Sequence, residues 1–206
     1  MKFILITYPK LISNEAKIIT SLFEGGLLRL HLRKPGIEQF DLRSIIEHIP
    51  IEFHDRIVVH HHFNLSNEYK LGGLHFNKGS LSHVKKYTHI KSLSYSAHNF
   101  DELLTTDKHM KYSFLSPIYP STSKENYLPH FTVEDFKLFK EKSVIKQNII
   151  ALGGITPNNI VEIQKFGFDG AAILGDFWNS FFSKGLTFAI DYIKQINELC
   201  NQGAHT

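Results

Sequence analysis

The sequence predicts an α/β protein with a single compact (β/α)8 barrel, or TIM barrel, formed by residues 1–206. Eight short apolar runs recur along the chain, stretches with helical spacing separate them, and helix-capping or helix-stopping residues stand where the pattern changes. Eight strand–helix units in a chain of this length favour a closed barrel over an open doubly wound sheet, which more often has about five or six strands.

The expected strands are spaced so that a helix fits before the next one. They cover residues 3–7, 27–32, 56–60, 72–76, 90–96, 111–116, 147–152 and 169–174. Between them, apolar residues repeat at the spacing of one helix face. The clearest sets are Ile18, Ile19, Leu22 and Phe23, then Leu42, Ile45, Ile46 and Ile49, and later Ile160, Ile163 and Phe166.

Several residues mark where helices begin and end. Asn99 and Thr156 are suited to the N-cap position, and Pro157 after Thr156 is suited to the first helical position. Gly25 and Gly167 are expected to end the helices that precede them. These signals agree with the strand–helix alternation.

The stretch "DFWNSFF", residues 176–182, is unusually apolar for a segment that follows the last strand. We expect a short helix that faces the core. A cover over the barrel end, an aromatic wall of a pocket and a subunit contact are the alternatives, and the last of these would make the chain a homodimer.

Composition excludes several classes of function. Lys and Arg number 23 against 20 for Asp and Glu, without a long run of like charges, so we expect no nucleic-acid partner and instead a small anionic ligand. Cys200 is the only cysteine, which predicts no internal disulfide and a reducing, cytoplasmic location. The N-terminal apolar run is too short for a signal peptide, and no run of about 18 apolar residues predicts a membrane span.

In a barrel of this kind the chemistry takes place at the carboxyl ends of the strands. The side chains expected there are mainly histidines and hydrogen-bond donors. They are His31, Arg33, Lys34, His60, His61, His62, Asn64, His75, Asn77, Ser94, Ser96, His98 and Asn99.

Glycines after the seventh and eighth strands predict a phosphate site. In "ALGGITPNN", Gly153 and Gly154 let a ligand approach the backbone closely, and a helix that begins at Thr156 would direct its N–H groups to the same point. Gly175 follows the eighth strand, and barrels frequently hold a phosphate between these two loops. The alternative is that the glycines only form a tight strand-to-helix turn.

The segment "SPIYPSTSK", residues 116–124, follows the sixth strand. Ser121, Ser123 and Lys124 offer hydroxyl donors and a positive charge at the same end of the barrel, which suits a phosphate. The alternative is a solvated turn set by the two prolines.

Taken in order, "HLRK", "GLHF", "SYSAH", "SPIYPSTSK" and "ALGGIT" resemble the thiamine phosphate synthase superfamily, which includes the TenI-like thiazole tautomerases. The resemblance spans about residues 27–178 and implies an enzyme of thiamine biosynthesis with a phosphorylated thiazole or a pyrophosphate as ligand. It also implies that Arg33 and Lys124 face the phosphate or pyrophosphate, and that Gly154 binds the thiazole phosphate through its backbone. Ser96 matches the family serine near the pyrophosphate.

By the same resemblance, Ser121 and Ser123 stand where the family has threonines. The chain departs from the synthases where they hold magnesium: they carry Asn-Asp after the third strand and Gly-Gln-Glu-Asp after the fourth, whereas this chain has His60-His61 and "NKGS", residues 77–80. Magnesium prefers oxygen ligands, chiefly carboxylates. We therefore expect no metal, no other cofactor and the function of a TenI-like tautomerase.

The resemblance gives His98 the position of the histidine proposed to be catalytic in the tautomerases, and His31 and His60 are its competitors. A thiamine phosphate synthase with an unusual metal site and a non-catalytic phosphate binder are the alternative functions. The run "HHH" also allows a zinc site of His60 or His62 with His31 or His98. Because neighbouring strand residues point to opposite faces, we expect polar strand-end residues there instead.

Overall fold

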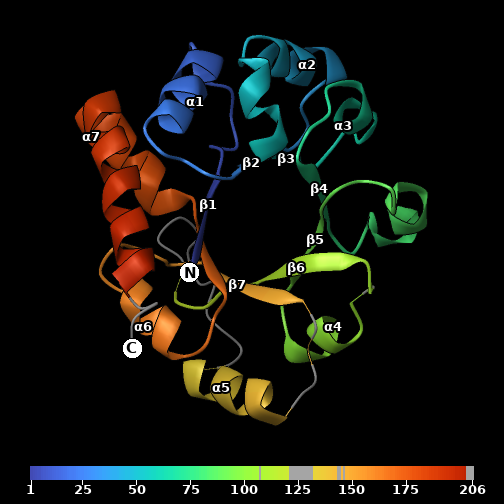
Figure 1. The fold of residues 1–206 in the computed structure, drawn as a ribbon, viewed down its shortest axis with the longest axis vertical. Helices are drawn as coiled ribbons and strands as arrows, with labels where there is room; N and C mark the ends of the chain where they lie inside the picture. Colours follow the sequence, from blue (N-terminus) through green and yellow to red (C-terminus); the bar gives the residue numbers. More distant parts are fainter. Residues whose placement is uncertain (107, 121–131, 143–144, 146, 203–206) are drawn as a thin grey trace.

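The structure, a computed structural model, describes residues 1–106, 108–120, 132–142, 145 and 147–202. Its centre is a closed barrel of parallel strands in which each strand pairs with the next and β8 pairs with β1 (Figure 1). The strands are β1 Lys2–Ile6, β2 Leu30–Leu32, β3 Ile57–Val59, β4 Gly73–Phe76, β5 Leu93–Ala97, β6 Met110–Leu115, β7 Asn148–Leu152 and β8 Gly170–Ile173. The predicted barrel is confirmed, and each expected run overlaps one strand.

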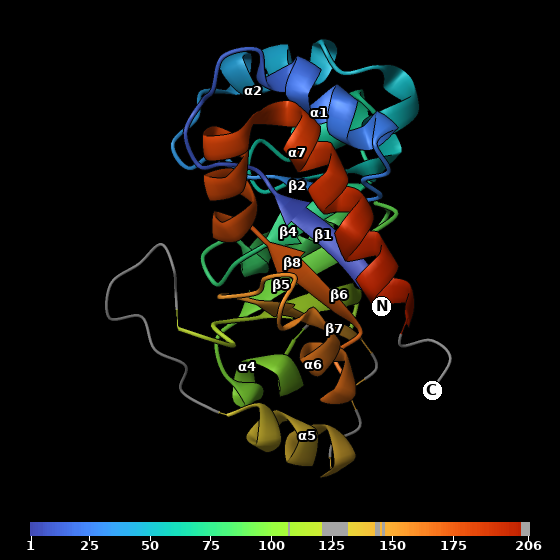
Figure 2. The ribbon, with the colours of Figure 1, turned by 90° about the vertical axis from the view of Figure 1, so that its left-hand side faces the viewer.

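Helices surround the barrel and connect consecutive strands (Figure 1). The α-helices are α1 Glu15–Glu24, α2 Gln39–Glu47, α3 Asn64–Glu68, α4 Phe100–Leu104, α5 Val133–Lys142, α6 Ile160–Lys165 and α7 Gly175–Gln202, and the 3-10 helices are η1 Ile51–Arg56 and η2 Leu81–Tyr87. The long α7 packs against α1, α6 and β1 (Figure 2). Within the described residues, no helix combines the length and the apolar character needed to cross a membrane.

Three of the predicted helix boundaries are confirmed. Asn99 caps α4, since its side-chain oxygen accepts a hydrogen bond from the Glu102 N–H at 2.8 Å. Gly25 follows the last residue of α1, and Gly167 follows α6 with a φ of 88°, a conformation that glycine adopts readily.

The predicted N-cap at Thr156 is wrong, because α6 begins four residues later at Ile160. The Thr156 N–H donates to Asn159 Oδ1 at 2.9 Å, and the Asn159 N–H donates back to the Thr156 carbonyl at 3.2 Å. These bonds close a turn ahead of the helix. The Thr156 amide is thus occupied within the chain.

Alternate strand residues point into the barrel and make two unlike halves. Strands β1, β6, β7 and β8 contribute an apolar cluster that is separate from the main core, made of Ile4, Ile6, Tyr112, Phe114, Ile150 and Ala172. On the other side, β2 and β4 contribute the buried side chains of His31 and His75, and β5 contributes buried Ser94. The barrel interior is therefore apolar on one side and hydrogen-bonding on the other.

The aromatic stretch 176–182 lies in the first part of α7. Phe177 and Trp178 are buried, and Trp178 Nε1 donates a hydrogen bond to the Ile6 carbonyl at 2.8 Å. The expected core-facing helix is confirmed. Gly185, with a φ of 81°, interrupts the helical geometry further along α7.

Candidate active site

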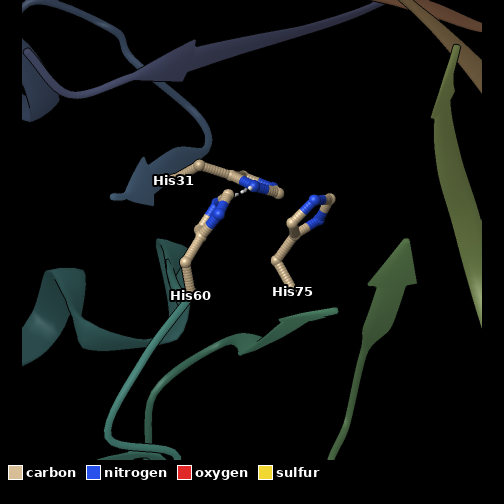
Figure 3. Close-up of side chains that lie close together, drawn as sticks. All are labelled: His31, His60 and His75. Atoms are coloured by element: carbon tan, nitrogen blue, oxygen red, sulfur yellow. Dashed lines mark hydrogen bonds between the residues drawn. The ribbon is translucent and has the colours of Figure 1, made fainter. Parts of the chain in front are cut away.

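Three histidine side chains meet inside the barrel near the carboxyl ends of its strands (Figure 3). His31 lies on β2, His60 follows β3 and His75 lies on β4. His31 Nδ1 is 3.0 Å from His60 Nε2, and the ring centres of His60 and His75 are 4.2 Å apart. We call these residues the histidine cluster. The sequence singles out His31 and His60 as candidate catalytic residues and does not pair His75 with them. Strand alternation is the available signal, because it can place His75 on the inner face of the barrel together with His31.

Side chains from across the barrel hold the inner member of the cluster. His31 is fully buried, and its Nε2 lies 2.6 Å from the Tyr112 hydroxyl on β6. The Phe114 ring packs against His31 and His75, with ring centres 4.7 and 4.8 Å apart. Both nitrogens of His31 therefore have a partner, and an aromatic ring borders the cluster.

The hydrogen bonds of His75 define which of its nitrogens carries the proton. Ser94 Oγ donates to the Leu74 carbonyl at 3.2 Å, so its oxygen accepts from His75 Nδ1–H at 2.8 Å. The lone pair of the neutral ring is then on Nε2, where the Ser96 hydroxyl donates at 2.7 Å. Ser96, expected near a pyrophosphate, thus contacts the histidine cluster directly.

Burial keeps the cluster neutral near pH 7. It lowers the pKa of His31 and of His60 well below the ordinary value, and lowers the pKa of His75 to about 3. The nearby Arg33 charge lowers the pKa of His60 and His75 further. Three uncharged imidazoles therefore lie beside a guanidinium.

A cavity of about 520 Å³ opens over the ends of β2, β3 and β4. Of the histidine cluster, His60 alone is among its described lining residues. In the described part of the chain, no carboxylate takes part in the lining. The lining residues are Gly36, Ile37, His60, His61, His62, Phe63, Asn64, Asn77, Gly79, Ser80 and Tyr87.

His98 is an exposed residue directly after β5, two positions beyond Ser96. Its Nδ1 lies 3.2 Å from the Ser116 carbonyl, which accepts when Nδ1 carries the proton, and 3.4 Å from the Ser116 hydroxyl, which can donate when Nδ1 carries the lone pair. Its backbone N–H donates to Glu102 Oε2 at 2.8 Å. Ring and backbone are thus both positioned at the end of β5.

The two loop glycines allow close packing of one loop against another. Gly153 and Gly154 have φ values of 96° and 65°. A Cβ on Gly154 would lie 2.6 Å from the Tyr119 Cβ and 2.9 Å from the Pro120 carbonyl oxygen, and a Cβ on Gly153 would lie 2.9 Å from the Pro117 Cα. Packing of the segment after β6 against the loop after β7 therefore requires both glycines.

The two basic residues after β2 differ in their surroundings. Thr7 Oγ1 accepts from the Arg33 N–H at 2.9 Å and donates to the Arg33 carbonyl at 3.0 Å, and the half-buried Arg33 lies close enough to influence His60 and His75. Lys34 is instead buried and bonded to Glu15 Oε1 at 2.5 Å. Arg33 is the one of this pair that can serve a ligand at the barrel mouth.

Other predicted residues have a simpler setting. Gly175 is the first residue of α7, and the adjacent Asp176 accepts a hydrogen bond from the Tyr192 hydroxyl at 2.7 Å. His62 bonds the Ile37 carbonyl at 2.8 Å. Ser121, Ser123 and Lys124 lie outside the described residues.

The family model described as thiamine monophosphate synthase matches residues 3–177 of the chain. The chain belongs to this family. A solved thiamine phosphate pyrophosphorylase from Bacteroides thetaiotaomicron is 36% identical, with a TM-score of 0.85 and coverage of 98% of both chains. The thiamine-phosphate synthase of Lactococcus lactis subsp. cremoris is 28% identical over 155 residues, which are 73% of this chain and 68% of that protein.

A thiamine phosphate pyrophosphorylase from Pyrococcus furiosus is 18% identical, with a TM-score of 0.77 over 96% of both chains, and shows the shared fold. Membership of the thiamine monophosphate synthase family supports an enzyme of thiamine biosynthesis. The particular reaction has to be argued from the site, because one fold carries many chemistries.

Proposed function

We propose that the chain is a thiazole tautomerase, which binds a phosphorylated thiazole at the barrel mouth and moves a proton between two of its positions. The observation that carries this proposal is the lining of the cavity over β2–β4, which contains histidine, asparagine and serine but no carboxylate among the described residues. Such a set is poorly suited to the magnesium that would neutralise a departing pyrophosphate. A proton shift has no leaving group to neutralise.

His98 acts as the acid and base in this proposal. The role requires the tautomer in which Nδ1–H donates to the Ser116 carbonyl, because the lone pair of the neutral ring is then on Nε2. That nitrogen takes a proton from one position of the bound thiazole and returns one to another, so that one bond to hydrogen breaks and one forms without a change of oxidation state. His60, at the cavity, is the first competitor for this role, and His31 lies deeper as its hydrogen-bonded partner.

The phosphate group is anchored by residues at the same end of the barrel. We assign Arg33 as the charged contact and the backbone N–H groups of Gly153, Gly154 and Gly175 as donors. Ser96 becomes a further donor when its hydroxyl turns from His75 Nε2 to the phosphate. The packing of the Gly153–Gly154 loop against the segment after β6 supports the assignment of these two glycines, because it holds their backbone in a fixed geometry. No nucleic acid takes part, and a reducing cytoplasmic setting suits the single cysteine.

A thiamine phosphate synthase is the second candidate, favoured by 36% identity to a pyrophosphorylase over nearly the whole chain. Two assays on the same sample separate the candidates. One follows isomerisation of a phosphorylated thiazole tautomer by NMR, and the other follows magnesium-dependent coupling of a phosphorylated thiazole to an aminopyrimidine pyrophosphate. Isomerisation without coupling supports the tautomerase, and coupling that a chelator abolishes supports the synthase. Binding without either reaction identifies a phosphate-ligand binder, and ultracentrifugation of the same sample tests whether the chain forms a homodimer.

A further inference from the structure

We propose that His31, His60 and His75 form a binding site for one divalent transition-metal ion of the zinc class. One nitrogen from each ring lies within 4.8 Å of one nitrogen from each of the other two. Nitrogen ligands about 2.0–2.1 Å from a tetrahedral zinc ion are about 3.4 Å from one another. The 3.0 Å contact between His31 Nδ1 and His60 Nε2 is already close to that spacing, so side-chain rotation, chiefly of His75, completes the site.

The hydrogen bonds around the cluster are those that orient histidine ligands. A metal-binding histidine usually donates its second N–H to an oxygen, which fixes the ring. Ser94 Oγ accepts from His75 Nδ1, so Nε2 is the ligand nitrogen, and the Ser96 hydroxyl at that position gives way to the ion. The Tyr112 hydroxyl oxygen stands 2.6 Å from His31 Nε2 and can accept from it when Nδ1 binds the ion.

A bound ion would replace the hydrogen bond between His31 and His60. Two imidazole nitrogens 3.0 Å apart share one proton between two lone pairs. An ion binds both lone pairs once each neutral ring carries its proton on the other nitrogen, His31 on Nε2 and His60 on Nδ1. Imidazole nitrogen suits Zn²⁺, Co²⁺, Ni²⁺ or Cu²⁺ and not the hard ion Mg²⁺, so this site differs from the magnesium site of the synthases.

Charge and access indicate what else the ion would bind. Three neutral imidazoles leave the ion with its full double charge, and Arg33 adds a further positive charge nearby. The fourth position therefore favours an anion, such as hydroxide or a phosphate oxygen. His60 lines the cavity, which gives both the ion and its fourth ligand a path from solvent. The sequence alone predicts no metal, because the magnesium carboxylates are missing and neighbouring residues of the histidine run point to opposite faces; it does not place His75 with His31 and His60.

The proposal is independent of the tautomerase assignment and is tested by metal binding alone. The protein, purified without a histidine tag and stripped with a chelator, is titrated with Co²⁺ while visible absorption is recorded, and Zn²⁺ is then added in competition. We expect one ion per chain and the intense visible bands of a low-coordinate cobalt site, lost as Zn²⁺ replaces Co²⁺. Inorganic phosphate should shift these bands by occupying the fourth position.

Variants locate the ion. H60N and H75Q should abolish the cobalt bands, whereas H61N, a neighbouring histidine outside the cluster, should retain them. Y112F should weaken binding about 10–100-fold, the usual effect of removing an outer hydrogen-bond partner of a ligand. Weak, pale octahedral cobalt spectra of the wild-type protein would overturn the proposal even if a variant fails to fold. Equal binding by wild type and H60N would also overturn it and leave the cluster as a hydrogen-bonded network.

Discussion

Replacement of Gly154 by alanine tests whether the loop glycines are required by packing. The new Cβ would lie 2.6 Å from the Tyr119 Cβ and 2.9 Å from the Pro120 carbonyl oxygen. A φ of 65° adds the strain of a left-handed residue, about 1–2 kcal/mol, and the overlap adds about 1–3 kcal/mol if the neighbouring segment moves. We expect G154A to lower the free energy of unfolding by about 2–5 kcal/mol.

Gly36 provides the matched control. It has a φ of 72°, and a Cβ there would meet nothing within 4 Å, so G36A carries the backbone strain without the overlap. Urea unfolding followed by circular dichroism should show a loss of about 1–2 kcal/mol for G36A. An equal loss in both variants would refute the packing argument, because the difference between them measures the overlap alone.

Three further predictions concern the core. Burial raises the pKa of the Cys200 thiol to about 11, so the folded protein should react with iodoacetamide at pH 8 about a hundredfold more slowly than the urea-unfolded chain; equal rates would contradict this. W178F removes the donor to the Ile6 carbonyl and should lower the free energy of unfolding by about 1–3 kcal/mol, whereas an unchanged urea midpoint would exclude a role for that bond. K34M leaves Glu15 buried without its partner and also removes the Lys34 bonds to the carbonyls of Tyr8 and Lys10, so it should cost about 3–5 kcal/mol, and K34M/E15Q should recover the part due to the ion pair; no recovery would show that the ion pair is not the cause.

Most of the barrel could be predicted because its repeating unit is local. Each strand–helix pair has its own apolar pattern, and capping residues such as Asn99 act within one turn. The second strand shows the limit of that pattern. Residues 27–32 read as one run, but β2 begins at Leu30, and Leu28 before it is 65% exposed. An apolar residue at the start of a short apolar run can thus belong to the loop that precedes the strand.

The site was less predictable because barrel closure creates its contacts. His31 and Tyr112 are far apart in sequence, and only closure of the barrel brings β2 opposite β6. No local spacing identifies such a pair. The helix start at Thr156 failed for a different, local reason: the Asn159 N–H donates to the Thr156 carbonyl and closes a separate turn, and α6 begins only at Ile160.

The proton-shift activity of His98 is the most direct test of the proposed function. H98Q and wild type are compared with a phosphorylated thiazole tautomer by NMR in the presence of a chelator, with H89Q as control because His89 precedes β5 at the opposite end of that strand. The account predicts that H98Q lowers turnover by about 10²–10⁴-fold while ligand affinity changes only a few-fold, and that H89Q behaves as wild type. Undiminished turnover by H98Q, or binding by the wild type without isomerisation, would contradict it.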